Sequence, residues 1–417
     1  MKTTRKLLII LFFCIGLLGI CPSAVSAAET DDTLPVPILT PEASSDGNGV
    51  KVDISHAYSS TQPYPVKHTE FEYSASPKFK DAEKVTVART LHGGDASYTF
   101  SNKKIKKYNG QLYVRTRELY VTDSDTEIYG PWSEPVSIVR VKLSKKNFPG
   151  LYKALKSGTY NAYVRKGDSS YTLKEFPYDT NQDGWLTSDE LSHISNLTVS
   201  DSLSDLKGIE YLTSLWNITL NKFTGTKADF SNNPKLSHIT IERQESKEIT
   251  IISPTATYIS VTENFYKDLK KIDLSACDNA VEITADGGQG TLTTLKLPKE
   301  KSNLRILSIS SLKCDTLDLN AYKNLEQLYI YGGSISSINV KKCKELRYCY
   351  LFYCSTIKSL DLSANTKLKG ADFYKNDKLT VSNVKAPKKA KITSNTGKWW
   401  YDTDSYEKDM KRINKYK

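Results

Sequence analysis

The sequence predicts a mainly β protein in which a β-sandwich is followed by a repeat solenoid. Residues 34–142 contain short segments of alternating apolar residues separated by Gly, Pro, Asp and Ser, a pattern typical of a sandwich or barrel. Residues 194–384 repeat one apolar frame every 20 to 24 residues, which is typical of stacked solenoid coils. A chain of 417 residues is long enough for two or three such domains.

The first segment, residues 1–27, has the features of a secretory signal peptide. Basic residues precede an apolar run from Leu7 to Ile20, and small residues follow it. This run is too short to span a bilayer comfortably, so we expect no transmembrane segment once it is removed. The mature protein is expected to be secreted, either free or associated with the cell surface. An uncleaved anchor and a lipoprotein modified at Cys21 are the alternatives.

The strings TEFEYSASPKFKDAEKVTVA, LYVRTREL and GPWSEPVSIV resemble fibronectin type III domains of secreted bacterial proteins. The resemblance implies a domain over residues 34–142, with Trp132 in its core and with Val114 and Thr116 pointing inward. It also implies a spacer or display role. Leu112 departs from the family, which often has Tyr at this place.

The strongest local motif lies at the domain junction, within residues 143–193. DTNQDGWLTSDE fits the pattern D-x-[DN]-x-[DN]-G-x5-E at every defined position and resembles the calcium loop of EF-hands. Ca²⁺ prefers six to eight oxygen ligands, which such a loop supplies at alternate positions. We therefore expect a structural calcium ion; a loop that has lost its ion is the alternative. The expected ligands are Asp179, Asn181, Asp183, the carbonyl of Trp185, Thr187 and Glu190.

The repeat frame is apolar-x-x-apolar-x-apolar, and it occurs nine times over residues 194–384. The first copy is Ile194/Leu197/Val199 and the ninth is Leu368/Ala371/Phe373. A second apolar trio, such as Ile335/Ile338/Val340, predicts another short extended edge in many units. The strings SDLKGIEYLTSL and KSLDLSANTKLKG resemble internalin-like bacterial cell-surface leucine-rich repeat proteins. This resemblance implies a small helical cap over residues 143–193, before the first repeat.

Five cysteines remain after the leader, all from Cys277 onward. An odd, clustered set without a C-x-x-C pair favours neither a disulfide framework nor zinc. Cys354 and Asn376 each follow a strand by three residues, where such repeats place Asn or Cys to bond neighbouring backbone. We therefore expect buried free thiols that fill repeat positions.

Side chains alternate between the two faces of a strand, so positions three, five and seven of each frame point outward onto the concave sheet. In the last four repeats six of the twelve such positions are aromatic, whereas the earlier repeats are mainly polar. A cluster of large amphipathic rings suggests a protein or glycan partner, although Tyr also simply favours strands. The candidate ligand-binding residues are Tyr329, Tyr331, Tyr348, Tyr350, Phe352 and Tyr374.

The formal charge of +11 falls to +8 when the three positive charges of the leader are removed. Residues 385–417 hold ten basic and four acidic residues, so this basic C-terminal cap or tail carries six of the eight charges. The body is nearly neutral, and we expect no nucleic-acid partner. The tail is a candidate for binding an anionic wall polymer; the alternative is a solvated end whose Trp399, Trp400 and Tyr401 cap the last coil.

These observations favour a secreted or cell-surface binding protein that uses the concave face of the solenoid, in adhesion or host interaction. A structural envelope protein without a discrete ligand is the alternative. An enzyme acting on glycans is disfavoured, because the five His residues show no metal-ligand spacing and no G-x-S-x-G, H-E-x-x-H or phosphate loop occurs.

Overall fold

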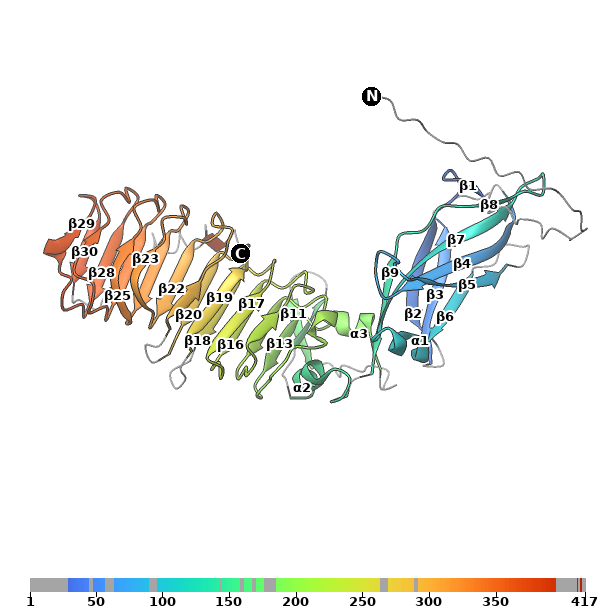
Figure 1. Ribbon diagram of the computed structural model, residues 1–417, viewed down its shortest axis with the longest axis horizontal. Coiled ribbons are helices and arrows are strands. Elements are labelled where there is room, and N and C mark those ends of the chain that lie inside the picture. The colour runs from blue at the N-terminus through green and yellow to red at the C-terminus, as the bar shows by residue number, and fades with distance from the viewer. Residues whose placement is uncertain are drawn as a thin grey trace, which may run out of the picture.

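The computed structural model shows an elongated, mainly β protein (Figure 1). An N-terminal β domain lies at one end, a solenoid forms the other, and α2 and α3 lie between them (Figure 1). The structure describes residues 29–44, 48–56, 64–89, 96–142, 144–157, 161–166, 170–175, 185–262, 269–288, 292–394, 411 and 413–414. No helix in these ranges is long and apolar enough to cross a membrane.

The N-terminal β domain contains two sheets within the described residues. The larger sheet has the order β1-β8-β7-β4-β5, with β9 also paired to β7, and the smaller has the order β2-β3-β6. Its elements are β1 (Glu29–Thr30), β2 (Pro37–Ala43), β3 (Gly49–His56), β4 (Val66–Ser74), β5 (Glu83–Ala88), β6 (Ser97–Ser101), α1 (Asn102–Lys107), β7 (Gln111–Val121), β8 (Glu127–Tyr129) and β9 (Val136–Val141).

Hydrophobic side chains from both sheets share one core. Val52 on β3 and Phe100 on β6 belong to the same cluster as Phe71 on β4 and Val114 on β7. Buried and half-buried residues alternate along most of β7, as expected for a strand that faces a core on one side only. Val114 and Thr116 are fully buried, in agreement with the sequence-based expectation.

Trp132 does not lie in this core, which corrects the expectation from the sequence. Its ring is half-buried, and the guanidinium groups of Arg115 and Arg117 lie 4.4 Å and 4.5 Å from its centroid. Cations over an aromatic face are attracted by the ring quadrupole. The indole therefore covers the larger sheet under charged side chains instead of filling the space between the sheets.

The segment between the two parts contains helices and an unpredicted hairpin. Its elements are α2 (Pro149–Ser157), β10 (Asn161–Lys166), β11 (Ser170–Glu175), β12 (Leu186–Thr187) and α3 (Ser188–Ser192). Strands β10 and β11 pair with each other, whereas β12 adds antiparallel to β9 of the N-terminal domain. The backbone N–H of Val139 also donates to Oγ of Ser188 at 3.0 Å. The start of the solenoid is thus joined to the last strand of the preceding domain.

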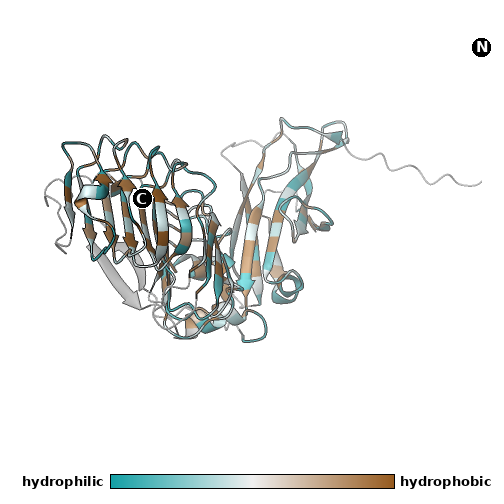
Figure 2. Cartoon of the chain, turned by 60° about the vertical axis from the view of Figure 1, so that its left-hand side comes forward, coloured by the Kyte–Doolittle hydropathy of each residue, from teal (hydrophilic) through white to brown (hydrophobic). Residues whose placement is uncertain are grey.

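The solenoid is built on a ten-stranded parallel sheet, and each of the nine strands predicted from the repeat frame is present. Figure 2 shows hydrophobic bands that recur on neighbouring strands of this sheet. A tenth strand, β30, follows beyond the predicted boundary at residue 384. The strands are β13 (Asn196–Val199), β14 (Asn217–Leu220), β16 (His238–Glu242), β18 (Tyr258–Thr262), β20 (Glu282–Asp286), β22 (Ile306–Ser310), β24 (Gln327–Tyr331), β26 (Tyr348–Phe352), β28 (Gly370–Tyr374) and β30 (Lys391–Ser394).

Shorter strands on the other side of the coils confirm the second extended edge. They form the sheets β15-β17-β19-β21, β23-β25 and β27-β29 in the described residues. Two 3-10 turns, η1 (Ile209–Tyr211) and η2 (Val381–Asn383), complete the solenoid. These strands are β15 (Lys227–Asp229), β17 (Glu248–Ile252), β19 (Lys271–Ala276), β21 (Thr294–Lys296), β23 (Lys313–Asp318), β25 (Ser334–Asn339), β27 (Leu360–Asp361) and β29 (Val384–Lys385).

The inward positions of the frame form one continuous hydrophobic core. Leu304, Leu307 and Ile309 are each fully buried, and the same columns are filled in the neighbouring coils. Burial of each such side chain stabilises the fold by about 1.5–3 kcal/mol. The repeated burial along the stack is therefore a main source of the stability of the solenoid. The cluster begins at Val139 and Val141 on β9, and the N-terminal domain therefore contributes to the solenoid core.

Polar side chains inside the turns bind the backbone of the preceding coil. Nδ2 of Asn233 donates to the carbonyls of Ile209 and Leu212, and Nδ2 of Asn365 donates to those of Val340 and Cys343. The thiols of two cysteines occupy the same turn position: Cys277 bonds the carbonyl of Ile251, and Cys343 bonds that of Leu319. Because buried backbone carbonyls need partners, Asn and Cys are interchangeable at this place. The prediction of buried free thiols at repeat positions is confirmed for Cys277, Cys343, Cys349 and Cys354.

Candidate functional site

The outward face of the ten-stranded sheet, here called the sheet face, carries the six predicted aromatic residues. They lie on β24, β26 and β28, which are neighbours in the sheet. The parallel register places Tyr350 directly beside Tyr329, and Phe352 beside Tyr331. The rings of the first pair stack with centroids 5.3 Å apart, and those of the second with centroids 5.1 Å apart. The structure therefore brings the predicted residues together in one cluster.

The cluster is more deeply covered than the sequence analysis expected. The three rings of β26, from Tyr348, Tyr350 and Phe352, are at most 6% exposed, whereas Tyr329, Tyr331 and Tyr374 are half-buried. Rungs about 4.8 Å apart allow rings in one column to stack flat. Phe352 lies between the rings of Tyr331 and Tyr374, while Tyr350 stacks on Tyr329 and contacts the rings of Tyr348 and Phe352 along its own strand. The aromatic side chains that a partner can reach are those at the margins of the cluster.

One margin of the cluster extends into the turn after β26. Tyr353 is 53% exposed, and its ring meets that of Tyr374 edge-on, with centroids 5.7 Å apart. The ammonium of Lys375 lies 5.4 Å from the centroids of both rings. We define Tyr331, Tyr353 and Tyr374 as the aromatic rim. Tyr353 lies one residue past the last outward column of the repeat frame, so the frame does not predict it.

The opposite margin of the sheet face is charged. The carboxylate of Glu326, which is 1% exposed, lies 3.7 Å from Nη1 of Arg305 and 3.3 Å from Nε of Arg347. These three residues hold the same position in successive coils, one residue before each strand begins. A buried carboxylate between two guanidinium groups is held in place by both of them. This row fixes the charged edge of the sheet and leaves the aromatic rim on the other edge.

A second aromatic stack lies on the early coils, where the sequence analysis found mainly polar residues. The ring of His238 lies 4.5 Å from that of Trp216 and 5.3 Å from that of Tyr258, measured between centroids. Trp216 is 48% exposed. Trp216 precedes β14 by one residue and so falls outside the columns that were compared. An alignment of the residues just before each strand would have shown it.

Residue Ile413 lies on the sheet face although it comes from the C-terminal segment. Its side chain is fully buried and packs with Val281, Ile306 and Tyr329. Of the other tail residues, the structure describes 385–394, Lys411 and Asn414, while Trp399, Trp400 and Tyr401 lie outside the described residues. Part of the sheet face near β20 and β22 is thus occupied by the chain itself.

The predicted calcium loop is described only in its second half. Asp179, Asn181 and Asp183 lie outside the described residues, whereas Trp185, Thr187 and Glu190 lie within them. Thr187 is the N-cap of α3: its Oγ1 accepts from the backbone N–H of Glu190 at 3.3 Å, and Oε2 of Glu190 accepts from the backbone N–H of Thr187 at 3.0 Å. This capping box orients Glu190, and its carboxylate chemistry fits a calcium ligand.

The buried cysteines have the properties of inert core thiols. Burial raises the pKa of Cys277, Cys343, Cys349 and Cys354 to about 12. Cys314 is half-buried, and burial raises its pKa as well. Since the thiolate is the reactive form, the four fully buried thiols are protonated and unreactive at neutral pH, whereas Cys314 is partly accessible.

Together, the register of the coils and the turn ladders define a parallel β-solenoid repeat protein. Among solved structures, it is similar to the functional domain of InlJ from Listeria monocytogenes, which includes a cysteine ladder, with 17% identity and a TM-score of 0.31 over 50% of this chain and 55% of that chain. The match thus spans about half of the InlJ structure. Pectate lyase Pel3 from Pectobacterium carotovorum matches with 10% identity and a TM-score of 0.16 over 87% of this chain and 100% of that chain. No protein-family model matches the chain, and no curated protein matches it.

Proposed function

We propose that this protein is a secreted or cell-surface binding protein whose sheet face binds a protein or a glycan, in adhesion or host interaction. The observation that supports this most is the aromatic rim of Tyr331, Tyr353 and Tyr374 beside the stacked core of the cluster. Tyr supplies a large, rigid contact area at low cost in conformational entropy, and such rings often dominate binding surfaces. Phe352 on β26 contacts the rings of Tyr331 and Tyr374 and so supports two of the three rim residues.

Other parts of the chain would support this role. Residues 1–27 would direct export, and the N-terminal domain would act as a fibronectin type III-like spacer. A calcium ion in the loop of residues 179–190 would be held by Asp179, Asn181, Asp183, the Trp185 carbonyl, Thr187 and Glu190. Such an ion would join the carboxylates of this loop to the start of α3 and stabilise the junction.

Variants of the aromatic rim test the proposal. Tyr331→Ala with Tyr374→Ala should weaken binding to a ligand found on a glycan array, or by pull-down with mass spectrometry, by about tenfold or more, because hot-spot residues contribute about 2 kcal/mol or more each. The affinity of the purified ligand is measured by calorimetry. Both positions are half-buried, so folding should be retained, unlike in a Tyr350 variant.

The matched control replaces two half-buried tyrosines of the N-terminal domain, Tyr64→Ala with Tyr113→Ala, and should bind normally. Equal affinity of the rim variant and the control would contradict the proposal and favour a structural envelope protein without a discrete ligand. Release of new reducing ends from a glycan that binds would instead indicate a glycan-acting enzyme.

A further inference from the structure

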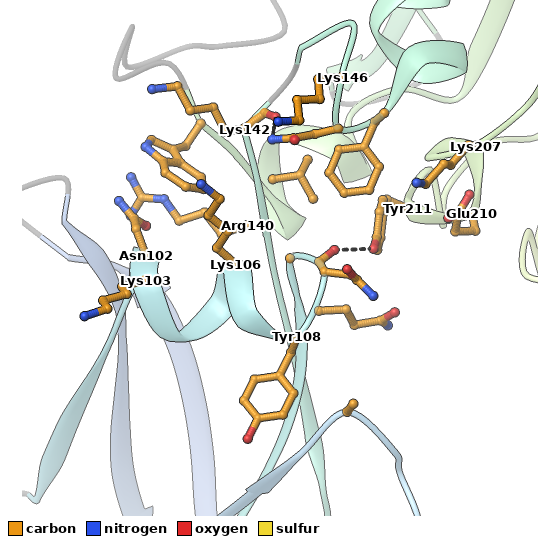
Figure 3. Close-up of a pocket in the computed structure, with 18 residues that line it drawn as sticks. Asn102, Lys103, Lys106, Tyr108, Arg140, Lys142, Lys146, Lys207, Glu210 and Tyr211 are labelled. Atoms are coloured by element: carbon orange, nitrogen blue, oxygen red, sulfur yellow. Dashed lines mark hydrogen bonds between the residues drawn. The ribbon is translucent and has the colours of Figure 1, made fainter.

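A pocket opens between the N-terminal domain and the start of the solenoid. Its volume is about 870 Å³, which is in the range of small-molecule sites. It is lined by α1 and the turn after it, by the end of β9, by the residues leading into α2, by Trp185 and by the turn around η1. Figure 3 shows Arg140 and Lys142 on one side of this junction pocket, with Lys207, Glu210 and Tyr211 on the opposite side.

The lining of the junction pocket is strongly basic. Six basic side chains line it against one acidic side chain, Glu210, a formal excess of five positive charges. Oε2 of Glu210 already accepts the backbone N–H of Gly208 at 2.7 Å. The basic residues are Lys103, Lys106, Arg140, Lys142, Lys146 and Lys207.

Some lysines elsewhere in the solenoid and the N-terminal domain are neutralised by carboxylates, whereas the five pocket lysines are not, within the part of the chain that the structure describes. Lys51, Lys227 and Lys367, for example, each form an ion pair with a carboxylate. None of the five pocket lysines forms an ion pair with any residue in the described ranges. Like charges that outnumber their counter-charges around one cavity create a field that attracts anions.

Aromatic rings form the remaining wall of the pocket. Phe148 and Tyr211 meet edge-on with centroids 5.4 Å apart, and the hydroxyl of Tyr211 donates to the carbonyl of Asn109 at 2.8 Å (Figure 3). The guanidinium carbon of Arg140 and the ammonium of Lys142 each lie 5.8 Å from the centroid of Trp185. The half-buried indole therefore lies beside the cationic groups, where a ligand can contact a ring and a charge together.

The walls of the pocket are held in fixed relative positions. Strand β12, which begins one residue after Trp185, pairs with β9, which carries Arg140. Arg140 is fully buried, and its Nη1 donates to the carbonyl of Gly49. Gly208 has φ of +97°, and an added Cβ there would lie 2.7 Å from Cβ of Leu151, so only glycine permits this approach of η1 to α2. A site with preset walls loses little entropy when it binds.

We propose that the junction pocket is a binding site for an anionic sugar, whose acidic group lies among the lysines while its ring packs on Trp185. The aromatic wall suits the apolar face of a sugar ring, and the lysines suit a phosphate, sulfate or carboxylate group. This site uses none of the residues of the sheet face, so it is independent of the function proposed above. The acidic group could belong to a phosphate-bearing glycopolymer or to a sulfated or uronic-acid glycan.

The test is isothermal titration calorimetry on the protein of residues 29–417 with three probes. They are a sulfated heparin tetrasaccharide, a glycerol phosphate oligomer substituted with sugar, and neutral chitotetraose. Binding of either anionic probe, weakened by added salt and absent for the neutral probe, is expected. The anionic probe that binds more tightly identifies the source of the ligand. Failure of both anionic probes to bind, or equal binding of the neutral probe, would overturn the proposal.

Variants separate the pocket from general attraction to positive charge. Lys106→Gln, Lys142→Gln and Lys146→Gln together should reduce the affinity about tenfold or more. The matched control removes the same charge from the basic tail through Lys385→Gln, Lys388→Gln and Lys389→Gln, all exposed, and should keep its affinity. Trp185→Ala keeps the backbone carbonyl that the calcium loop would use, and it should lower the affinity for the anionic saccharide. An equal or larger loss in the tail control would place the anion site on the tail and refute the pocket.

Discussion

At the scale of single residues, the thiols give a direct test of packing. In the protein of residues 29–417, Cys314 should react with a chromogenic disulfide reagent at pH 8, whereas Cys277, Cys343, Cys349 and Cys354 should react only on unfolding, because burial raises their pKa to about 12. As the pH rises from 9 toward 12, the thiolate fraction of these four grows and their reaction should accelerate.

The variant Cys314→Ser provides the control, because it should remove the rapid phase and leave the slow one unchanged. Rapid titration of two or more thiols in the folded protein at pH 8 would show that the turn cysteines are accessible. It would then be wrong to regard Cys277 and Cys343 as equivalents of Asn233 and Asn365 in the ladder.

At the scale of elements, the capping box of α3 separates two roles of Glu190. Glu190→Ala removes the acceptor for the backbone N–H of Thr187 and should lower stability by about 1 kcal/mol even in chelator. Glu190→Gln keeps an acceptor oxygen but loses the charge and the bidentate carboxylate, so it should melt like the parent in chelator and lose most of the rise in Tm on adding Ca²⁺. Thermal melts with and without Ca²⁺ measure both effects.

Asp179→Ala is the partner variant, since it should abolish the calcium-dependent rise in Tm without touching the capping box. If the parent melts identically in calcium and in chelator, the loop binds no ion and Glu190 serves the cap alone. If Glu190→Gln retains the full rise, its carboxylate is not a ligand.

The turn that follows the strand in several coils contains a residue in the left-handed backbone conformation. Arg243, Ser311, Gly332, Tyr353 and Lys375 stand two residues after the last inward residue of their strands, and all have φ between +51° and +64°. Left-handed backbone costs non-glycine residues about 1 kcal/mol. The coils therefore tolerate strain at this position in exchange for a turn that keeps each strand in register with the next.

At the scale of the whole molecule, the two parts should behave as one cooperative unit. Val139 and Val141 belong to the solenoid core, and β12 pairs with β9. A fragment of residues 143–417 should therefore melt at a lower temperature than the protein of residues 29–417, because Leu186 loses its paired neighbour Val141. Differential scanning calorimetry compares the two.

A fragment that begins at residue 130 and keeps β9 is the informative control, since it should recover part of the lost stability. Independent melting of the solenoid at the same temperature in all three proteins would show that the contact between β9 and β12 contributes nothing.

The sequence was sufficient to predict the strands that a regular repeat of apolar residues specifies. The columns of Leu307, Leu328 and Leu351 recur at nearly constant spacing, and each such residue is buried as the frame predicts. The frame could not predict what covers a face. The burial of Tyr350, the position of Ile413 on the sheet face and the stack at Trp216 depend on neighbours in other coils or far along the chain. The prediction for Trp132 was wrong for a related reason, because its cationic partners Arg115 and Arg117 lie on β7, earlier in the chain.

The junction pocket was invisible in the sequence for the same reason. Its lysines come from three separate stretches of the chain, 103–106, 142–146 and 207, which are brought together by contacts of α1 with β9, of Tyr211 with Asn109 and of Leu151 with Lys207. The calcium motif, by contrast, is contiguous and could be recognised from its spacing alone.

The antiparallel pair of β9 and β12 has a consequence for how the molecule presents itself. Strand β9 runs on in sequence toward α2, and β12 returns to it from beyond the hairpin, so the two halves are joined at two separated points. A single connection would let the two parts rotate relative to each other, whereas two connections restrict that rotation. If the N-terminal domain is tethered, the aromatic rim points in one direction relative to that tether. Many copies on one surface would then present their aromatic rims in a common orientation rather than in random orientations.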